Sequence, residues 1–359
     1  MIRSTLRRAA LAPLAAATLA ATAVGLAGPA SAAPAAGFET LTPVCSAQLP
    51  ITHPGCVAGT SYRGAPLPDG TPNQIVQLRG DDRFATAATI AEHGFPEADV
   101  AVLVSGGDRH LVDALSAAPL ARSLAAPVLL GTRDSVPAAT ASYLQEHQVK
   151  AVLLVGGADA LGEATTGRLQ ALGVTSVARV AGADRYATSR ALVALMPKAT
   201  HGWVASGEDA HLVDALAASG PAARLAEPLL LVADGDPLPA AASLKALGVT
   251  STTVAGGPEG VAPEALAPLP APQRAAGTDR YGTAGELAVE SVDRGVDADD
   301  LLFAPGVTGH LVDALAAGPL GRATLLVGDV DSSYDTVEAW FDTYGAGRIT
   351  AVGAVEIDD

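Results

Sequence analysis

The chain has 359 residues, of which 49% are hydrophobic and only 4% aromatic, and its formal net charge is −16. This length suits two or three domains, and the hydrophobic content is enough for cores built from Ala, Val and Leu. An acidic chain repels the phosphates of nucleic acids and anionic membrane surfaces at long range. We therefore expect no nucleic-acid partner and no binding to anionic membranes.

The first residues have the pattern of a secretory signal peptide. Arg3, Arg7 and Arg8 precede an apolar run over residues 9–27, and Ala30-Ser31-Ala32 fits the small-x-small rule for cleavage. We predict a signal peptide over residues 1–32 and a secreted mature chain; a retained membrane anchor is the alternative. The later apolar runs are too short to span a bilayer, so no membrane span is expected after the signal is removed.

Two cysteines, Cys45 and Cys56, lie close together in the segment that follows. In an exported chain they are expected to form a disulfide. A metal site is disfavoured, because two thiols with only His53 nearby fall short of the usual four ligands. Residues 33–74 show neither helical nor strand periodicity, so we predict an irregular segment pinned by this disulfide.

Two sequence blocks recur three times along the rest of the chain. The first block, with the pattern Gly-x-Asp-Arg-aromatic-x-Thr, occurs within residues 79–86, 181–188 and 276–283. The second block, His-Leu-Val-Asp-Ala-Leu, is unchanged at residues 110–115, 211–216 and 310–315. The aspartates of the two blocks are 31, 30 and 34 residues apart in the three copies. We infer three repeats, over residues 75–175, 176–271 and 272–359.

Each repeat alternates strand and helix patterns. In the first, we predict strands over residues 75–78, 100–104, 128–130 and 151–155, and helices over residues 85–92, 111–124, 138–147 and 161–172. The second repeat follows with strands at 203–205, 229–232 and 252–255, and the third ends after a strand at 349–352, without a closing helix. Uniformly apolar strands separated by amphipathic helices predict an α/β fold with parallel sheets covered on both faces.

With both blocks in hand, the chain resembles the cell-wall-binding repeat 2 family. The resemblance rests on the first block, the Asp-Ala-Leu-Ala-Ala helix start, the Pro-Leu-Leu-Leu strand and the Val-x-Gly-Gly strand end, over about residues 75–359. It implies three Rossmann-like or Toprim-like units packed as an intramolecular pseudo-trimer. One departure is that His-Leu-Val stands before Asp-Ala-Leu, where the family usually has Phe-Pro.

The resemblance also implies a function. Members attach non-covalently to the wall of Gram-positive bacteria, often through anionic polymers. We therefore expect a secreted, wall-associated, non-catalytic protein without a cofactor, whose partner is a teichoic acid-like or other wall polysaccharide. The Ala, Gly and Arg bias of the composition indicates a high-GC source.

Candidate ligand-binding residues follow the predicted strands. Ligands of parallel sheets gather at the carboxyl ends of the strands, where helix N-termini also attract phosphate or carboxylate. The candidates are Asp82, Arg83, His110, Asp113, Asp184, Arg185, His211, Asp214, Asp279, Arg280, His310 and Asp313. For the Asp-Arg pairs, the alternative is a helix cap with an arginine bridge between repeats. For Asp113, Asp214 and Asp313, the alternative is a favourable charge in a first helical turn.

The three histidines allow several interpretations. If His110, His211 and His310 lie near a pseudo-threefold axis, they suit a divalent metal. Away from an axis they are separate polar contacts, pH-sensitive groups or packing residues. Packing or hydrogen bonding is the simplest of these interpretations.

Catalysis is the alternative function, as a secreted hydrolase acting on wall fragments. Ser105, His110 and Asp113 recur as a second trio in copy two, but the third copy has Pro305 in place of the serine. There is no Gly-x-Ser-x-Gly elbow, and no Gly-x-Gly-x-x-Gly follows a first strand. The sequence therefore favours binding over hydrolysis and predicts no dinucleotide site.

Overall fold

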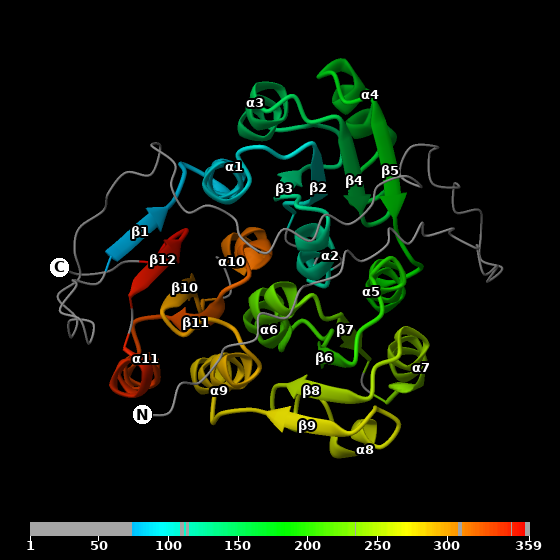
Figure 1. Ribbon diagram of the computed structural model, residues 1–359. Coiled ribbons are helices and arrows are strands. Elements are labelled where there is room, and N and C mark those ends of the chain that lie inside the picture. Colours follow the sequence, from blue (N-terminus) through cyan, green and yellow to red (C-terminus); the bar gives the residue numbers. More distant parts are fainter. Residues whose placement is uncertain are drawn as a thin grey trace, which may run out of the picture.

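The computed structural model describes residues 74–107, 111–112, 115–233, 235–307, 311–345 and 347–355. The predicted signal peptide, the irregular segment and the Cys45–Cys56 pair lie outside the described residues. Within those residues, the strands form three separate four-stranded sheets around a common centre (Figure 1). Every strand pairing within the three sheets is parallel, as the uniformly apolar strands predict.

The three sheets share one strand order. Sheet 1 comprises β3 (Val128–Gly131), β2 (Val100–Ser105), β4 (Ala151–Val155) and β5 (Ser176–Val180). Sheet 2 comprises β7 (Leu229–Val232), β6 (His201–Ser206), β8 (Ser251–Ala255) and β9 (Pro272–Ala275). Sheet 3 comprises β11 (Ala323–Val327), β10 (Asp300–Pro305), β12 (Arg348–Val352) and β1 (Gln74–Leu78).

Sequence repeats and sheets are offset by one strand. The strand that begins the second repeat, β5, is the edge strand of sheet 1, and β9 likewise completes sheet 2. The strand that begins the first repeat, β1, pairs with β12 near the other end of the chain, in register from Gln74↔Arg348 to Leu78↔Val352. The third repeat has no such strand after β12 among the described residues, so β1 completes its sheet and closes the structure into a ring (Figure 1).

Three helices that follow the second strand of each repeat occupy the centre. They are α2 (Ala117–Ser123), α6 (Leu212–Leu225) and α10 (Leu311–Ala317), which continues into the 3₁₀ helix η4 (Gly318–Leu320). They contact one another, and one apolar cluster runs through all three units. At Gly318 a side chain would collide with Ala118 and Ser219, because the helices approach so closely there. This arrangement confirms the predicted pseudo-trimer.

The remaining helices link the sheets or cover their outer faces. The linking helices are α1 (Arg83–Gly94), α5 (Arg185–Val193) and α9 (Arg280–Asp293), each packed on the edge strand of the sheet that it leads into. The outer helices are α3 (Ala138–Glu146), α4 (Glu163–Ala171), α7 (Leu238–Leu247), α8 (Pro263–Leu266) and α11 (Asp331–Tyr344). No helix follows β12 in the described part of the chain.

The prediction of one helix over residues 111–124 is wrong, because α2 begins at Ala117. A helix starting at 111 would place Pro119 in its interior, where proline lacks the N–H and its ring clashes with the preceding turn. Starting at Ala117 puts Pro119 in the first turn, where no N–H is needed. The other copies differ: α6 continues through Pro221, whereas α10 ends before Pro319 and gives way to η4.

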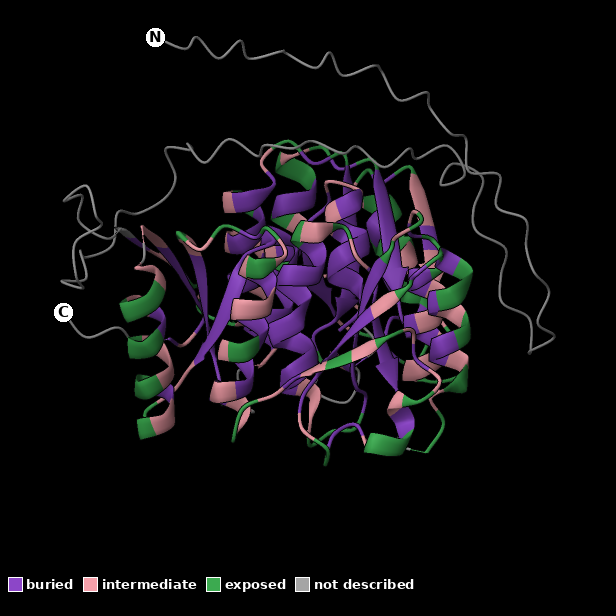
Figure 2. Ribbon diagram, turned by 60° about the horizontal axis from the view of Figure 1, so that its bottom comes forward, coloured by how far each residue is buried: buried purple, intermediate pink, exposed green. Residues whose placement is uncertain are grey.

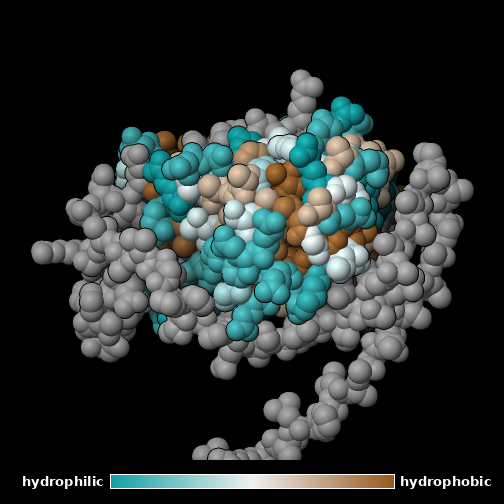
Figure 3. Space-filling view, turned by 90° about the horizontal axis from the view of Figure 1, so that it is seen from above, coloured by the Kyte–Doolittle hydropathy of each residue, from teal (hydrophilic) through white to brown (hydrophobic). Residues whose placement is uncertain are grey.

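Buried residues fill most of the strands and the central helices, whereas the edge strands β5 and β9 are mostly half-buried and exposed residues gather on the outer helices (Figure 2). Seen from above, hydrophobic residues reach the surface in a limited area between hydrophilic ones (Figure 3). None of the described helices is long and apolar enough to cross a membrane.

Candidate functional site

The aspartates of the first block cap the linking helices. Asp82, Asp184 and Asp279 each stand at the N-cap, in extended backbone, before α1, α5 and α9. Their carboxylates accept hydrogen bonds from Ala85 N (2.8 Å), Ala187 N (2.7 Å), and Tyr281 N and Gly282 N (3.0 and 2.9 Å). A carboxylate here satisfies helical N–H groups that lack partners and favours the helix dipole.

The arginines of the first block join neighbouring sheets. Each of them follows the edge strand of one sheet and donates to a backbone carbonyl of the next sheet. The donors are Arg83, Arg185 and Arg280, and the acceptors lie just after β2, β6 and β10, respectively. The acceptors are Gly106 O (2.7 Å), Gly207 O (2.6 Å) and Gly306 O (2.8 Å). Arg185 also binds Asp209, at 2.6 Å. The same bridge thus recurs at each of the three junctions between sheets.

The other positions of the first block fix the turn before each linking helix. The N–H of its glycine donates to the threonine hydroxyl six residues later, at 3.1, 3.0 and 3.1 Å in the three copies. Its aromatic ring lies against the glycine that carries the bridged carbonyl, leaving no room there for a side chain. These structural roles were not identified from the sequence, although the invariant spacing of Gly and Thr within the block was a visible sign.

In sheets 2 and 3, the second block places a buried carboxylate against the glycine that directly follows β8 and β12, respectively. Asp214 lies in the first turn of α6 and is only 7% exposed. A Cβ on Gly256, which has φ +98°, would collide with its Oδ2. Asp313 and Gly353 repeat the arrangement in sheet 3. The glycine therefore serves both a left-handed backbone and the close approach of the aspartate. His110, Asp113 and His310 lie outside the described residues.

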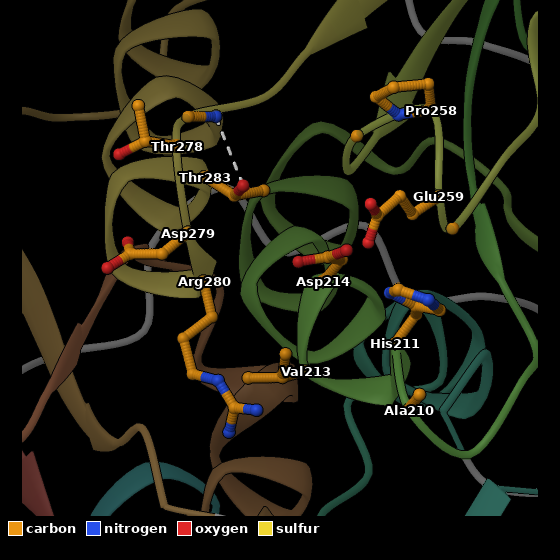
Figure 4. Close-up of a pocket in the computed structure, with 13 residues that line it drawn as sticks. Ala210, His211, Val213, Asp214, Pro258, Glu259, Thr278, Asp279, Arg280 and Thr283 are labelled. Atoms are coloured by element: carbon orange, nitrogen blue, oxygen red, sulfur yellow. Dashed lines mark hydrogen bonds between the residues drawn. The ribbon is translucent and has the colours of Figure 1, made fainter.

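A cavity of about 440 Å³ opens beside Asp214, at the carboxyl edge of sheet 2 (Figure 4). Three segments form it: the start of α6, the loop after β8 and the turn before α9. Its lining comprises Ala210, His211, Val213, Asp214, Gly257, Pro258, Glu259, Gly260, Gly277, Thr278, Asp279, Arg280 and Thr283. We call this cavity the junction pocket.

The junction pocket combines residues of different repeats. In the sequence, His211 and Asp214 belong to the same copy as Asp184 and Arg185. In the structure they share the pocket with Asp279 and Arg280 of the following copy, because β9 is the edge strand of sheet 2. The offset between repeats and sheets produces this exchange.

The carboxylates of the pocket differ in their environments. Burial raises the pKa of Asp214 from 3.8 to about 6, and the charges of His211 and Arg280 only partly oppose it. For Asp279, burial acts in the same direction. Hydrogen bonds from Ser332 and from the backbone, together with the charge of Arg280, outweigh it and hold the pKa below its usual value. Asp279 is therefore fixed as a cap, whereas Asp214 is a carboxylate poorly compensated by the protein.

Copy two shows where the histidine of the possible metal site and the serine of the possible hydrolase trio lie. His211 lies against Gly260 and lines the pocket of its own sheet. The described residues hold no group of three or more His, Cys, Asp or Glu suited to a metal ion. The Ser206 hydroxyl accepts a hydrogen bond from Glu208 N, at 3.1 Å. Within the described segments Ser206 and His211 form no hydrogen bond, so copy two shows no nucleophile–base pair.

Comparison with known proteins identifies a family and relatives that are similar to this chain. The model of the family "Cell wall binding domain 2" matches residues 77–166 and 179–266. N-acetylmuramoyl-L-alanine amidase LytC of Bacillus subtilis (strain 168) is 32% identical over 216 residues, which are 60% of this chain and 42% of the amidase.

Two solved structures share the fold. Cwp8 from Clostridium difficile superposes with a TM-score of 0.67 at 27% identity, over 79% of this chain and 50% of that one. Cwp6 from Clostridium difficile superposes with a TM-score of 0.71 over 84% of this chain and 49% of that one, and at 21% identity it supports the fold alone. The chain thus spans half or less of the length of each of these relatives. Through its first two repeats, the chain belongs to the cell wall binding domain 2 family.

Proposed function

We propose that this chain is a secreted, non-catalytic protein that attaches non-covalently to a polymer of a Gram-positive cell wall, a teichoic acid-like or other wall polysaccharide. The observation that carries the proposal is that three sheets with one strand order surround a common centre, and that the cell wall binding domain 2 model matches the first two repeats. The junction pocket offers a recess at the strand ends where parallel sheets commonly bind ligands.

Repetition also suits a polymeric ligand. The first block forms the same bridge at all three junctions, so equivalent surfaces are presented around the ring. Contacts of modest strength then act together on one polymer chain, and the combined attachment is far tighter than any single contact.

Hydrolysis of wall fragments is the competing proposal, favoured by the similarity to an amidase. The similarity covers only 42% of that amidase, and the serine of the candidate trio is Pro305 in the third copy. Turnover of purified wall fragments by the mature chain, lost on replacing Ser206 by Ala, would establish hydrolysis instead of simple attachment.

The test of attachment is co-sedimentation of residues 33–359 with purified sacculi of the source organism. We expect the protein in the pellet, with an unrelated acidic protein of similar size left in the supernatant. One sample of sacculi is stripped of teichoic acid and a second sample is stripped of neutral polysaccharide. The treatment that abolishes retention of the protein identifies the polymer that it binds. Recovery in the supernatant at every salt concentration would refute the proposal.

A further inference from the structure

The junction pocket contains a buried carboxylate that the protein leaves without a hydrogen-bond donor. Asp214 is more than nine-tenths buried, and none of the described residues donates a hydrogen bond to it or forms an ion pair with it. Its carboxylate lies at the pocket and faces the open space (Figure 4). Buried charges in proteins are usually paired, so a buried carboxylate without a hydrogen-bond donor at the wall of a cavity indicates a ligand that donates to it.

The other charged groups of the pocket determine what kind of ligand suits it. The side chain of Glu259 is directed toward Asp214, with the His211 ring beside both (Figure 4). Arg280 points away from Asp214 and donates one hydrogen bond, from Nη1, to Gly306 O. Asp279 also points away and caps α9. The open space therefore lies between two carboxylates, and the guanidinium of Arg280 is directed away from it.

An anionic group is disfavoured in this position. The start of α6 attracts anions through its free N–H groups, but Asp214 in its first turn opposes that attraction. A phosphate would also lie between the carboxylates of Asp214, which is buried, and Glu259, and like charges repel. A cation is favoured for the same reasons, since it would pair with both carboxylates.

We infer that the junction pocket binds a primary ammonium group carried by the wall, with Asp214 and Glu259 as its acceptors. The group belongs to an amino sugar or to an amino-acid substituent, and the two sources share this chemistry. The inference rests on the proposed function, whose ligand it narrows at this site. An anionic backbone of the same polymer would then contact the protein outside the junction pocket.

The inference predicts a dependence on pH. An amine with the ordinary α-amino pKa of about 7.7–8.0 is mostly protonated at pH 7.5 and fully protonated at lower pH. Asp214, with its pKa raised to about 6, also becomes protonated as the pH falls. The other titratable groups that line the pocket are Glu259 and His211, which lie beside this carboxylate, and Asp279 and Arg280, whose side chains point away from it. Protonation of Asp214 removes the charge that the ammonium needs, so amine binding should weaken as the pH falls from 7.5 to 5.

The test uses soluble probes with residues 33–359. Glucosamine, N-acetylglucosamine and glucose 6-phosphate are titrated at pH 7.5, followed by NMR chemical-shift changes. D-alanine methyl ester and its N-acetyl derivative represent the amino-acid source. We expect the free amines to bind at least about tenfold more tightly than their acetylated forms, because acetylation removes one charge-assisted hydrogen bond and this is the change in dissociation constant that such a loss produces. Tighter binding of glucosamine would assign the ammonium group to an amino sugar, and tighter binding of D-alanine methyl ester would assign it to an amino-acid substituent.

Variants separate the pocket from the rest of the surface. Asp214→Asn and Glu259→Gln should each abolish the preference for free amines, while Glu264→Gln, an exposed acid on α8 outside the pocket, should keep it. Circular dichroism and the melting temperature show whether each variant is folded, and Glu259→Gln, at an exposed position, gives the test should Asp214→Asn unfold.

Several results would overturn the inference: equal binding of amines and their acetylated forms, tighter binding of glucose 6-phosphate, or binding that EDTA removes. The last would indicate a metal between the same carboxylates. Sedimentation with sacculi but without amine preference would refute this inference and leave the proposed function standing. Amine preference without sedimentation would refute the proposed function instead.

Discussion

Replacing Asp214 by Asn tests whether this carboxylate is kept in the fold at a cost to stability. The side chain is 7% exposed, and no described residue donates a hydrogen bond to it. Burial raises its pKa from 3.8 to about 6. A raised carboxyl pKa means that the folded state holds the proton more tightly than the unfolded state. Its contribution to stability is therefore present at low pH and is lost as the pH rises from 3.8 through 6.

The magnitude follows from these two pKa values. Between pH 5 and pH 7.5, the parent protein should lose about 1.4 kcal/mol of unfolding free energy because of this one group. The Asn variant has no charge to lose. Its stability relative to the parent should therefore rise by about 1.4 kcal/mol over the same interval. The amide must also be accommodated beside Gly256, which shifts the difference by a similar amount at both pH values and so leaves the pH dependence intact.

Urea denaturation of both proteins at pH 5.0 and 7.5 measures this difference, because contributions of all other titrating groups cancel between parent and variant. Asp184→Asn is the matched control, because it makes the same chemical change at an exposed N-cap carboxylate outside the pocket. A stability difference for Asp214→Asn that is constant, or that moves the other way, would show that the carboxylate is compensated in the native state.

Three further outcomes are expected. Gly256→Ala should cost at least about 2 kcal/mol in urea denaturation, because φ is +98° and the new Cβ meets Asp214, whereas Gly257→Ala, with nothing within 4 Å of its Cβ, should be nearly neutral. Asp184→Ala should lose about 1 kcal/mol through its N-cap, a loss that Asp184→Asn avoids; equal losses would exclude capping as the cause. Calorimetry should show one unfolding transition, because the central core spans all three units. Ile75→Ala in β1 should lower the free energy of unfolding by about 2–4 kcal/mol and leave a single transition; separate transitions would contradict the closed ring.

Much of the fold could be predicted because it depends on local sequence patterns. Strand β4 was predicted to the residue, since its five apolar residues are bounded by turn signals. The central helix of the first repeat was predicted to begin six residues too early. There the helical periodicity continues through residues 111–116, and the equivalent segment of copy two does form one helix, α6, through Pro221. The sequence pattern therefore does not distinguish the two starting points.

The pairing of the sheets could not be predicted from these patterns. A parallel edge strand looks the same in sequence whether it joins the sheet before it or the sheet after it. The pairing of β1 with β12 is a contact between the two ends of the described chain, with no local signature. For the same reason, the meeting of Asp214 with Arg280 of the next repeat was missed, although both had been identified as candidates.

The most direct measurement of the central claim is a binding isotherm of residues 33–359 on sacculi of the source organism at pH 7.5, beside those of Asp214→Asn and Glu264→Gln. If the ring of repeats attaches the protein to the wall and the junction pocket contributes, the parent and Glu264→Gln should saturate the sacculi alike. Asp214→Asn should need at least about tenfold more protein for the same occupancy. Three superimposable isotherms would remove the pocket from wall attachment, and no retention of the parent would contradict the claim itself.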